Sequence, residues 1–361
     1  MVSESESDNE LRNTLNDCVE QSGKDAFGRQ LSNTFKCRLE SDNSSREFFI
    51  YIPEKYTSGR SPAALLLSLH GYTSTARTNL GYSGFQSLAE GEGFLVVYPQ
   101  GSILPTTQET HWNVGGWTSQ STTDDIDFID SMIDYLDSNY LVNLNRIYST
   151  GMSNGGYMSL LLACQLSEKI AAVASVTGSM TPETYDGCNA QHPIPTLQIH
   201  GTNDSDVPYN GVWWSLSIED VISYWVNYNN CNINPTITSF PDLDLLDGST
   251  VDHFVYSDCD NDVTTEHIKV LGGNHTWPGS AFDLPGLNTN QDINASILVW
   301  QFFSKYDING LINPPMSISE HIKQKEVVKI IDLLGRESKN TNQPLFYIYD
   351  DGTIEKRIII E

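Results

Sequence analysis

Short hydrophobic runs with the length of strands alternate with longer amphipathic stretches along most of this chain, and this alternation constrains the fold most strongly. Residues 63–70 (AALLLSLH) are apolar at successive positions, which is typical of a strand buried on both faces. Residues 123–139 place apolar side chains from Ile126 to Leu136 on one face of a helix. Strands that alternate with helices predict an α/β fold with a mostly parallel central sheet. The other predicted strands cover residues 47–52, 93–98, 145–150, 171–176, 195–200 and 267–271, and the other predicted helices cover residues 155–165, 218–228 and 295–303.

Composition divides the chain into four parts. Residues 1–25 are polar and without periodicity, which predicts a flexible tail, and residues 26–306 form the predicted α/β domain. Residues 307–315 (DINGLINPP) have the turn-forming composition of a linker. Residues 316–361 contain a hairpin turn at Asp350-Asp351-Gly352 and predict a small β-sandwich-like domain. Its strand-like runs are residues 327–334, 344–349 and 353–360.

The charge of the chain excludes several classes of partner. Its 361 residues include 46 Asp and Glu against 20 Lys and Arg, which gives a net charge of −26. Such a field repels phosphate backbones and anionic membranes, and it makes acidic polysaccharides poor substrates, so we expect no nucleic-acid partner. No apolar run in the sequence approaches the roughly 20 residues of a membrane span. Residues 316–361 are almost neutral, so nearly all of the negative charge lies on the preceding part.

The six cysteines form an even set without a CxxC motif, which argues against a zinc cluster or a thioredoxin-like redox motif. Two interpretations remain: three disulfides in an exported protein, or six buried thiols in a cytosolic one. The first ten residues, MVSESESDNE, are not a signal peptide, so either a leader has been removed or the protein stays inside the cell. The cysteines favour removal of a leader.

A G-x-S-x-G pentad at residues 151–155 follows one predicted strand and opens a predicted helix. In such a turn the glycines avoid clashes while Ser153 is lifted above the sheet as a nucleophile. The alternative is a glycine-rich loop with no chemical role. The position between strand and helix favours the nucleophile.

A serine nucleophile needs a base to take its proton and an acid to orient that base. Asp204 follows the predicted strand 195–200 and is the candidate acid, with Asp206 as its rival and a turn-capping role as the alternative for both. His275 lies on a glycine-rich loop after the strand 267–271 and is the candidate base. The chain order Ser153, Asp204, His275 is that of the α/β-hydrolases. The remaining candidates fit less well: His253 and His267 lie within predicted strands, His192 precedes a proline, and His321 lies beyond the linker.

An oxyanion hole requires two backbone donors that face the charge formed in the transition state. The N–H of Asn154, directly after the nucleophile, is one candidate. The second is the N–H of Tyr72, in the loop His70-Gly71-Tyr72 after an early strand, and the ring of Tyr72 could also wall the acyl pocket.

With these residues in place, the chain resembles the secreted esterases grouped with poly(3-hydroxybutyrate) depolymerases and with feruloyl and acetylxylan esterases. The resemblance covers roughly residues 37–303 and implies an α/β-hydrolase fold with Ser153, Asp204 and His275 as the catalytic triad. Tyr72 stands where many depolymerases have Cys, which departs from a polymer-degrading pattern. The motifs that carry the resemblance are LHGYTSTA, VYPQG, DDIDFID, GMSNGGYMS, IHGTNDSDVPY and GGNHTWPG.

The resemblance also implies disulfides Cys164–Cys188 and Cys231–Cys259, which leaves Cys18 with Cys37. The run PDLDLLDGSTVD from Pro241 could pass for a calcium loop, but it lacks EF-hand spacing and resembles a family hairpin. We therefore expect no metal and no other cofactor.

The segment VVKIIDLLGRE…PLFYIYDDGTIEKRIIIE resembles the carboxy-terminal sorting domain of the Bacteroidetes type IX secretion system. This resemblance implies the type IX secretion machinery as a partner and a secreted or cell-surface location. The alternative is a β accessory module, for example one that binds carbohydrate.

Aromatic side chains cluster near the predicted site, at Trp112, Trp117, Trp213, Trp214 and Trp277. Flat apolar side chains suit bulky ester substrates, so Trp117 and Trp277 are predicted to contact substrate, although such residues are equally common in cores.

The sequence therefore predicts a monomeric, secreted serine carboxylesterase that hydrolyses hydroxycinnamoyl (feruloyl) or acetyl esters of polysaccharides. The alternative substrate is a polyhydroxyalkanoate or another polyester. A non-catalytic carbohydrate-binding protein is the alternative of another class, against which the presence of Ser153 and His275 argues.

Overall fold

The computed structural model describes residues 18–25, 28–41, 44–59, 61–280, 288–312, 327–331, 345–349 and 354–357. The chain divides into two units, Met1–Ile312 and Asn313–Glu361, and each is described by itself.

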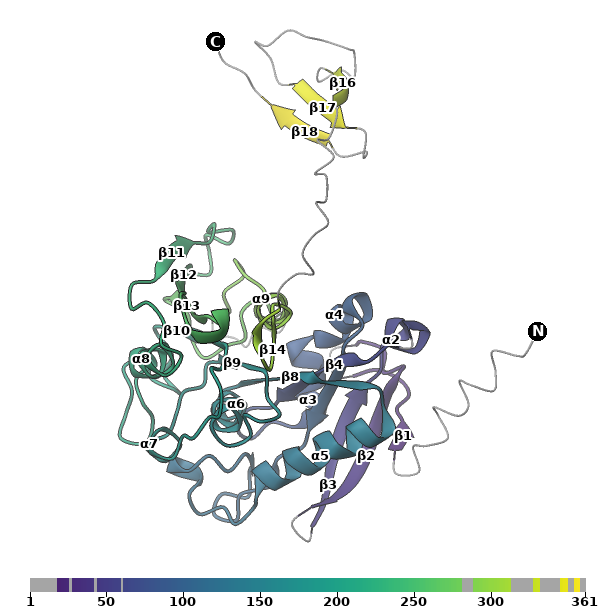
Figure 1. Cartoon of the computed structure of the whole chain (residues 1–361), viewed down its shortest axis with the longest axis vertical. Helices are drawn as coiled ribbons and strands as arrows, with labels where there is room; N and C mark the ends of the chain where they lie inside the picture. The colour runs from purple at the N-terminus through teal and green to yellow at the C-terminus, as the bar shows by residue number, and fades with distance from the viewer. Residues whose placement is uncertain are drawn as a thin grey trace, which may run out of the picture. The chain divides into compact units, whose positions relative to one another are not determined.

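The first unit is built on one large mixed β-sheet (Figure 1). Within the described residues, eleven strands form this sheet in the order β1-β2-β3-β5-β4-β8-β9-β10-β13-β12-β11. The six neighbours from β5 to β13 run parallel, and antiparallel strands flank them on both sides. The α/β fold predicted from the sequence is therefore confirmed. The strands are β1 (Cys18–Glu20), β2 (Thr34–Ser41), β3 (Ser44–Tyr51), β4 (Ala63–Leu69), β5 (Leu95–Pro99), β8 (Val142–Met152), β9 (Ala172–Val176), β10 (Thr196–Gly201), β11 (Thr236–Ser239), β12 (Thr250–Tyr256) and β13 (Thr265–Leu271).

Helices cover both faces of this sheet, and the helices on opposite faces belong to separate apolar clusters. Helices α5, α6 and α8 contribute to one cluster, while α3, α4 and α9 contribute to the other. Asp124 caps α5 by accepting a hydrogen bond from the Asp127 N–H, and acidic side chains in the first turn suit the helix dipole. The helices are α2 (Glu54–Gly59), α3 (Ala76–Ser83), α4 (Phe85–Glu92), α5 (Asp125–Asn139), α6 (Asn154–Gln165), α7 (Pro182–Asp186), α8 (Ile218–Tyr228) and α9 (Ala295–Phe303), with 3-10 turns η1 (Gly116–Thr118) and η2 (Asp260–Asp262).

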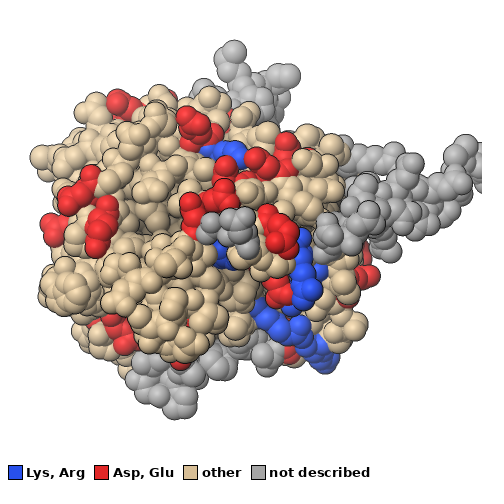
Figure 2. All heavy atoms as spheres, turned by 90° about the horizontal axis from the view of Figure 1, so that it is seen from below, with Lys and Arg blue, Asp and Glu red and all other residues tan. Residues whose placement is uncertain are grey.

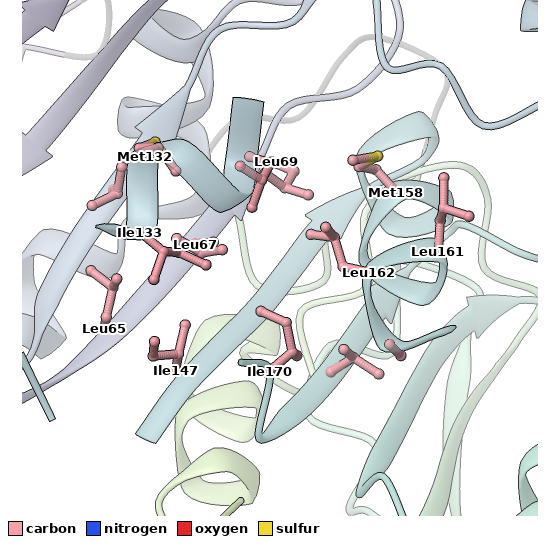
Figure 3. Packing of buried hydrophobic residues seen from close by; sticks show 14 of the residues in the cluster. Leu65, Leu67, Leu69, Met132, Ile133, Ile147, Met158, Leu161, Leu162 and Ile170 are labelled. Atoms are coloured by element: carbon pink, nitrogen blue, oxygen red, sulfur yellow. The ribbon is translucent and has the colours of Figure 1, made fainter. Parts of the chain in front are cut away.

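Strand β4 shows why the central strands are apolar throughout. Leu65, Leu67 and Leu69 pack in the cluster with α5 and α6, whereas Leu66 packs in the cluster on the opposite face. Figure 3 shows these three leucines beside Met132 and Ile133 of α5 and Met158 and Leu162 of α6. Because both faces are buried, the strand has no solvent-facing polar positions.

Three disulfides connect segments of the first unit: Cys18–Cys37, Cys164–Cys188 and Cys231–Cys259. Two of these pairs, Cys164–Cys188 and Cys231–Cys259, are the ones that the resemblance implies, and Cys18–Cys37 is the pair that was then left. The first of them joins β1 to β2, so residues 18–20 belong to the sheet and not to the predicted tail. Residues 1–17 of that tail lie outside the described residues.

The predicted linker at residues 307–315 begins too early. Strands β14 (Tyr306–Asp307) and β15 (Gly310–Leu311) pair within the first unit, and the Tyr306 side chain is buried. A second short antiparallel pair, β6 (Ser102–Ile103) with β7 (Thr110–His111), follows β5 in the chain. Turn-forming residues in the 307–310 segment therefore make a tight turn within the unit.

The described strands of the second unit form a three-stranded antiparallel sheet of β16 (Val327–Ile331), β17 (Leu345–Tyr349) and β18 (Ile354–Arg357). The predicted hairpin turn at residues 350–352 lies outside the described residues, and the described part shows one sheet and not a sandwich.

The surface agrees with the charge of the sequence. On the face seen in Figure 2, acidic side chains are spread widely and basic side chains occupy smaller areas. None of the described helices is long and apolar enough to cross a bilayer. Among the described residues, His, Cys, Asp and Glu side chains do not gather in groups of three or more that could hold a metal ion.

Candidate active site

Ser153 lies on a strained turn directly after β8 and before α6. Its backbone has φ 55° and ψ −121°, a conformation that side-chain-bearing residues rarely adopt and that is maintained only by surrounding contacts. The Ser153 N–H donates to the Val176 carbonyl at 2.8 Å. A Cβ on Gly151 would lie 2.4 Å from the backbone of Gly155, and a Cβ on Gly155 would lie 2.3 Å from the Leu69 oxygen. Both glycines of the pentad are therefore required by close backbone contact.

Asp204 and His275 come from loops after two parallel strands, β10 and β13, and lie next to each other. His275 Nδ1 lies 2.8 Å from Asp204 Oδ2. The other carboxylate oxygen, Oδ1, accepts from the backbone N–H groups of Asp206 at 2.9 Å and Val207 at 2.8 Å. Asp206 itself is exposed and lines the cavity that holds Ser153, and it contacts Asp204 through its backbone N–H. The carboxylate that faces His275 is thus that of Asp204, the predicted acid.

A second histidine, His200 at the end of β10, also contacts Asp204. His200 Nε2 lies 3.3 Å from Asp204 Oδ2 and 2.9 Å from the Val207 carbonyl, so this nitrogen carries the proton. Burial would raise the pKa of Asp204, but the hydrogen bonds from His200 and His275 outweigh burial and hold this pKa well below its usual value. Asp204 therefore remains a carboxylate that can orient His275 at any moderate pH.

The segment that precedes Tyr72 approaches Ser153 from the end of β4. A Cβ on Gly71 would lie 3.6 Å from Ser153 Cβ, which shows how close this backbone runs to the serine. His70 holds the segment in place: its Nδ1 lies 2.8 Å from the Gly71 carbonyl, and its Nε2 accepts from the Gly101 N–H at 2.9 Å. Burial lowers the pKa of His70 to about 4, so the ring is neutral near pH 7.

Trp112 links the His70 segment to Asn154. The Trp112 N–H donates to Asn154 Oδ1 at 2.7 Å, and Asn154 Nδ2 donates to the Trp112 carbonyl at 3.1 Å. The indole N–H of Trp112 donates to the His70 carbonyl at 2.9 Å. Because Trp112, Asn154 and His70 are all buried, these bonds fix the relative positions of the two segments that carry the predicted oxyanion donors.

A cavity of about 540 Å³ opens onto Ser153 and His275. Tyr72 lines this cavity, and its hydroxyl donates to Thr107 Oγ1 at 2.6 Å. Trp117 and Trp214 form another wall, with ring centroids 4.9 Å apart in an edge-to-face arrangement. The cavity therefore offers flat apolar surfaces close to the serine.

The prediction that Trp277 contacts substrate is wrong. Its side chain is 1% exposed, and its ring packs edge-to-face against Tyr82 and Phe85. The indole N–H donates to Ser296 Oγ at 2.9 Å. Trp277 lies two residues after His275, but its ring points into the core, where it supports the cavity-lining Tyr82 from behind.

Sequence reasoning missed several parts of this site. The role of the Asn154 side chain was hidden because the pentad leaves that position open, and the bond from His200 was hidden because a histidine at a strand end is usually structural. The sequence identifies Trp214 only as an aromatic residue, since it does not show which of two adjacent tryptophans turns inward. Trp214 is half-buried in the cavity wall, whereas Trp213 is 84% exposed.

The chain is similar in sequence to known esterases. The chain is 28% identical over 270 residues to the bifunctional acetylxylan esterase/xylanase XynS20E of Neocallimastix patriciarum, and 28% identical over 241 residues to feruloyl esterase B of Piromyces equi. These alignments cover 75% and 64% of this chain. The chain spans only 35% and 42% of the relatives' own lengths.

Among solved structures, the acetyl xylan esterase from Aspergillus awamori superimposes with a TM-score of 0.52 at 16% identity. The match covers 74% of this chain and 98% of that one. At this level of identity the likeness supports the fold.

The sequence matches are to esterases, and the solved structure supports the same α/β fold. The chain belongs to the Esterase family, whose sequence model matches residues 40–236.

Proposed function

We propose that the protein is a serine carboxylesterase in which Ser153 is the nucleophile, His275 the general base and Asp204 the residue that orients the base. The observation that carries this proposal is the 2.8 Å contact between His275 Nδ1 and Asp204 Oδ2 beside a cavity that also exposes Ser153. With Nδ1 bonded to the carboxylate, Nε2 of His275 is left to accept a proton.

In the first half of the reaction, the Ser153 oxygen attacks the ester carbonyl while His275 takes the hydroxyl proton. The backbone N–H groups of Tyr72 and Asn154 stabilise the oxyanion of the tetrahedral intermediate. When that intermediate collapses, the bond to the alcohol breaks and His275 gives the alcohol its proton, which leaves an acyl-enzyme. Water, activated by His275, then attacks the acyl carbon and releases the acid and free Ser153.

We propose acetyl or hydroxycinnamoyl esters of polysaccharides as the substrate class. Two observations support this choice: the relatives named above are acetylxylan and feruloyl esterases, and Trp117 and Trp214 give the cavity flat walls beside the serine. A small acetyl group or a planar phenolic acid would fit against such walls.

The mechanism is tested with Ser153→Ala on p-nitrophenyl acetate. We expect turnover to fall to the level of the uncatalysed reaction while the far-ultraviolet circular dichroism and Tm stay close to those of the parent. Retained turnover would contradict the mechanism.

The substrate class is tested with the parent enzyme on methyl ferulate, acetylated xylan and polyhydroxybutyrate film. Faster turnover of the first two supports the proposal, whereas preferential erosion of the film would identify a polyester depolymerase.

We also propose an extracellular location, with the carboxy-terminal domain predicted at residues 316–361 as the signal for type IX secretion. Three disulfides suit an oxidising compartment. In a host that has this secretion system, the full chain should reach the medium or cell surface, and a chain lacking residues 313–361 should remain with the cells. Equal export of both chains would refute the proposal.

A further inference from the structure

A second hollow, of about 710 Å³, lies on the surface formed by α7 and α8 and is separate from the cavity at Ser153. Three of its lining residues are tyrosines: Tyr185 on α7, and Tyr224 and Tyr228 on α8. We call this surface the tyrosine groove. The mechanism above assigns no role to it.

The three rings are arranged as an open aromatic surface. Tyr224 and Tyr228 are one helical turn apart, with ring planes inclined by 12° and centroids 6.1 Å apart. The Tyr185 ring lies 5.0 Å from that of Tyr224, and its side chain is 42% exposed. The Tyr228 hydroxyl donates to the Ala190 carbonyl at 2.7 Å, which holds that ring in position. Contiguous exposed aromatic surface on a folded domain often marks a binding site.

Polar side chains surround the rings and determine which ligand is compatible with them. Asp186, Asp220 and Asn227 line the groove and are exposed, so they can exchange hydrogen bonds with a ligand rich in hydroxyl groups. No Lys or Arg is among the described residues that line the groove. An anionic chain would therefore meet two carboxylates with no counter-charge, whereas a neutral sugar can place its C–H face on a tyrosine ring and its hydroxyls on these polar groups.

The tyrosine groove adjoins the candidate active site through one short segment. Trp214 lines the cavity at Ser153, and Leu216, two residues later, lines the groove. Gly116 forms a second link, because its backbone packs closely against both Thr181 and Trp214. A Cβ added at Gly116 would lie 3.0 Å from the Thr181 side chain and 3.1 Å from the Trp214 carbonyl oxygen. Thr181 immediately precedes the groove, at the N-cap of α7, and Gly116 immediately precedes Trp117 in the cavity wall.

We infer that the tyrosine groove binds the sugar chain of a neutral polysaccharide and thereby holds an ester on that chain near Ser153. This inference rests on the proposed esterase function and adds the carrier of the ester to it. The main chain of the polysaccharide would lie on Tyr185 and Tyr224, and the ester branch would enter the cavity past Trp214.

Binding is measured separately from catalysis with full-length Ser153→Ala protein, by calorimetry with xylohexaose, cellohexaose and oligogalacturonate. We expect the Ser153→Ala protein to bind a neutral hexasaccharide. Adding Tyr185→Ala and Tyr224→Ala should weaken that binding at least about tenfold, as expected for the loss of two aromatic contacts. Leu246→Ala, a truncation at a side chain that is 94% exposed on the loop between β11 and β12 and does not line the groove, is the control and should bind like its parent.

Activity supplies the second readout, with Ser153 intact. In Tyr185→Ala, whose side chain is the most exposed of the three, the ratio of kcat/KM on acetylated xylan to kcat/KM on p-nitrophenyl acetate should fall about fivefold or more, through KM for the polymer. Because this ratio is internal to each protein, partial unfolding does not imitate the effect.

Three results would overturn the inference: no binding of either neutral hexasaccharide, equal binding with and without the two tyrosines, or equal or tighter binding of oligogalacturonate. Failure of the proposed function is distinguishable, since it would appear as p-nitrophenyl acetate hydrolysis that does not depend on Ser153.

Discussion

The backbone of Trp112 and the side chain of Asn154 exchange two hydrogen bonds, N–H to Oδ1 at 2.7 Å and Nδ2 to the carbonyl at 3.1 Å. Asn154 directly follows Ser153, the proposed nucleophile, and its backbone N–H is one of the two donors proposed for the oxyanion hole. Its side chain thus ties the start of α6 to the loop that also reaches the His70 carbonyl through the Trp112 indole. The two halves of the proposed oxyanion hole are coupled through one tryptophan.

Replacing Asn154 with Ala should therefore lower kcat while KM for small esters changes little. The backbone N–H remains but loses its support, and we expect kcat to fall by about 10- to 100-fold, less than for the loss of an oxyanion donor itself. Leaving the buried Trp112 N–H and carbonyl without partners should also lower the free energy of unfolding by about 2–3 kcal/mol. Asn154→Asp keeps the acceptor for the Trp112 N–H. Its kcat should therefore lie between those of the parent and of Asn154→Ala. Steady-state kinetics with urea unfolding would test this, and an unchanged kcat in Asn154→Ala would refute the coupling.

Replacing Asp204 with Asn should reduce kcat by about 10³- to 10⁴-fold, because an amide no longer holds the correct tautomer of His275. Asp206→Asn is the comparison variant: this carboxylate is exposed at the edge of the cavity, and Asp206 contacts Asp204 through its backbone N–H. We expect this variant to stay within about threefold of the parent, as is usual for surface changes. The test is kcat on p-nitrophenyl acetate for both variants. A larger loss of kcat in Asp206→Asn than in Asp204→Asn would make Asp206 the acid.

Trp117 and Trp277 should respond differently to truncation because one lines the cavity and the other is buried in the core. Trp277→Ala removes a fully buried ring and its bond to Ser296, so it should lower the free energy of unfolding by about 3–5 kcal/mol. Trp117→Ala should affect stability less and should raise KM for methyl ferulate more than KM for p-nitrophenyl acetate. Thermal unfolding and kinetics on both esters test this pair, and equal loss of stability in the two variants would contradict the assignment.

The parts of this fold that could be predicted from the sequence are those in which local pattern and burial agree. Both faces of β4 are buried, so its run of apolar residues identified it, and α8 and α9 have the bounds that their periodicity predicted. Strand β11, whose residues are all exposed, has no apolar pattern to show and was missed. The strand β1 was missed because it is only three residues long and is held by β2 and a disulfide.

In the candidate site, too, some residues could be placed from the sequence and others could not. The proximity of Ser153, Asp204 and His275 was predictable because each follows a recognisable strand, and the carboxyl ends of parallel strands meet at one edge of a sheet. The direction of an aromatic ring depends on tertiary packing, which is why Trp277 was assigned to the substrate and Trp214 was not. The Asn154–Trp112 pair joins residues 42 positions apart, and no local pattern reports such a contact.

The last prediction concerns pH and His267, a buried histidine that the proposed mechanism does not use. Its ring lies between those of Tyr209 and Phe254, with centroids 5.9 and 5.8 Å away, and its Nε2 has no hydrogen-bond partner among the described residues. Burial lowers the pKa of His267 from 6.5 to about 3. The unfolded chain therefore binds a proton between pH 6.5 and 3 that the folded chain does not bind, and the free energy of unfolding falls as the pH falls through this range.

Between pH 6.5 and 4, this single group should remove about 3 kcal/mol of stability from the parent protein. In His267→Phe, which keeps a flat ring between Tyr209 and Phe254 and cannot be protonated, the loss over the same interval should be smaller by that amount. Other buried groups, including His70 with its pKa of about 4, titrate equally in both proteins and cancel in the comparison. Urea unfolding at pH 6.5, 5 and 4 measures the difference, and parallel pH dependences of the two proteins would show that His267 is already charged, or hydrogen-bonded in its charged form, in the folded state.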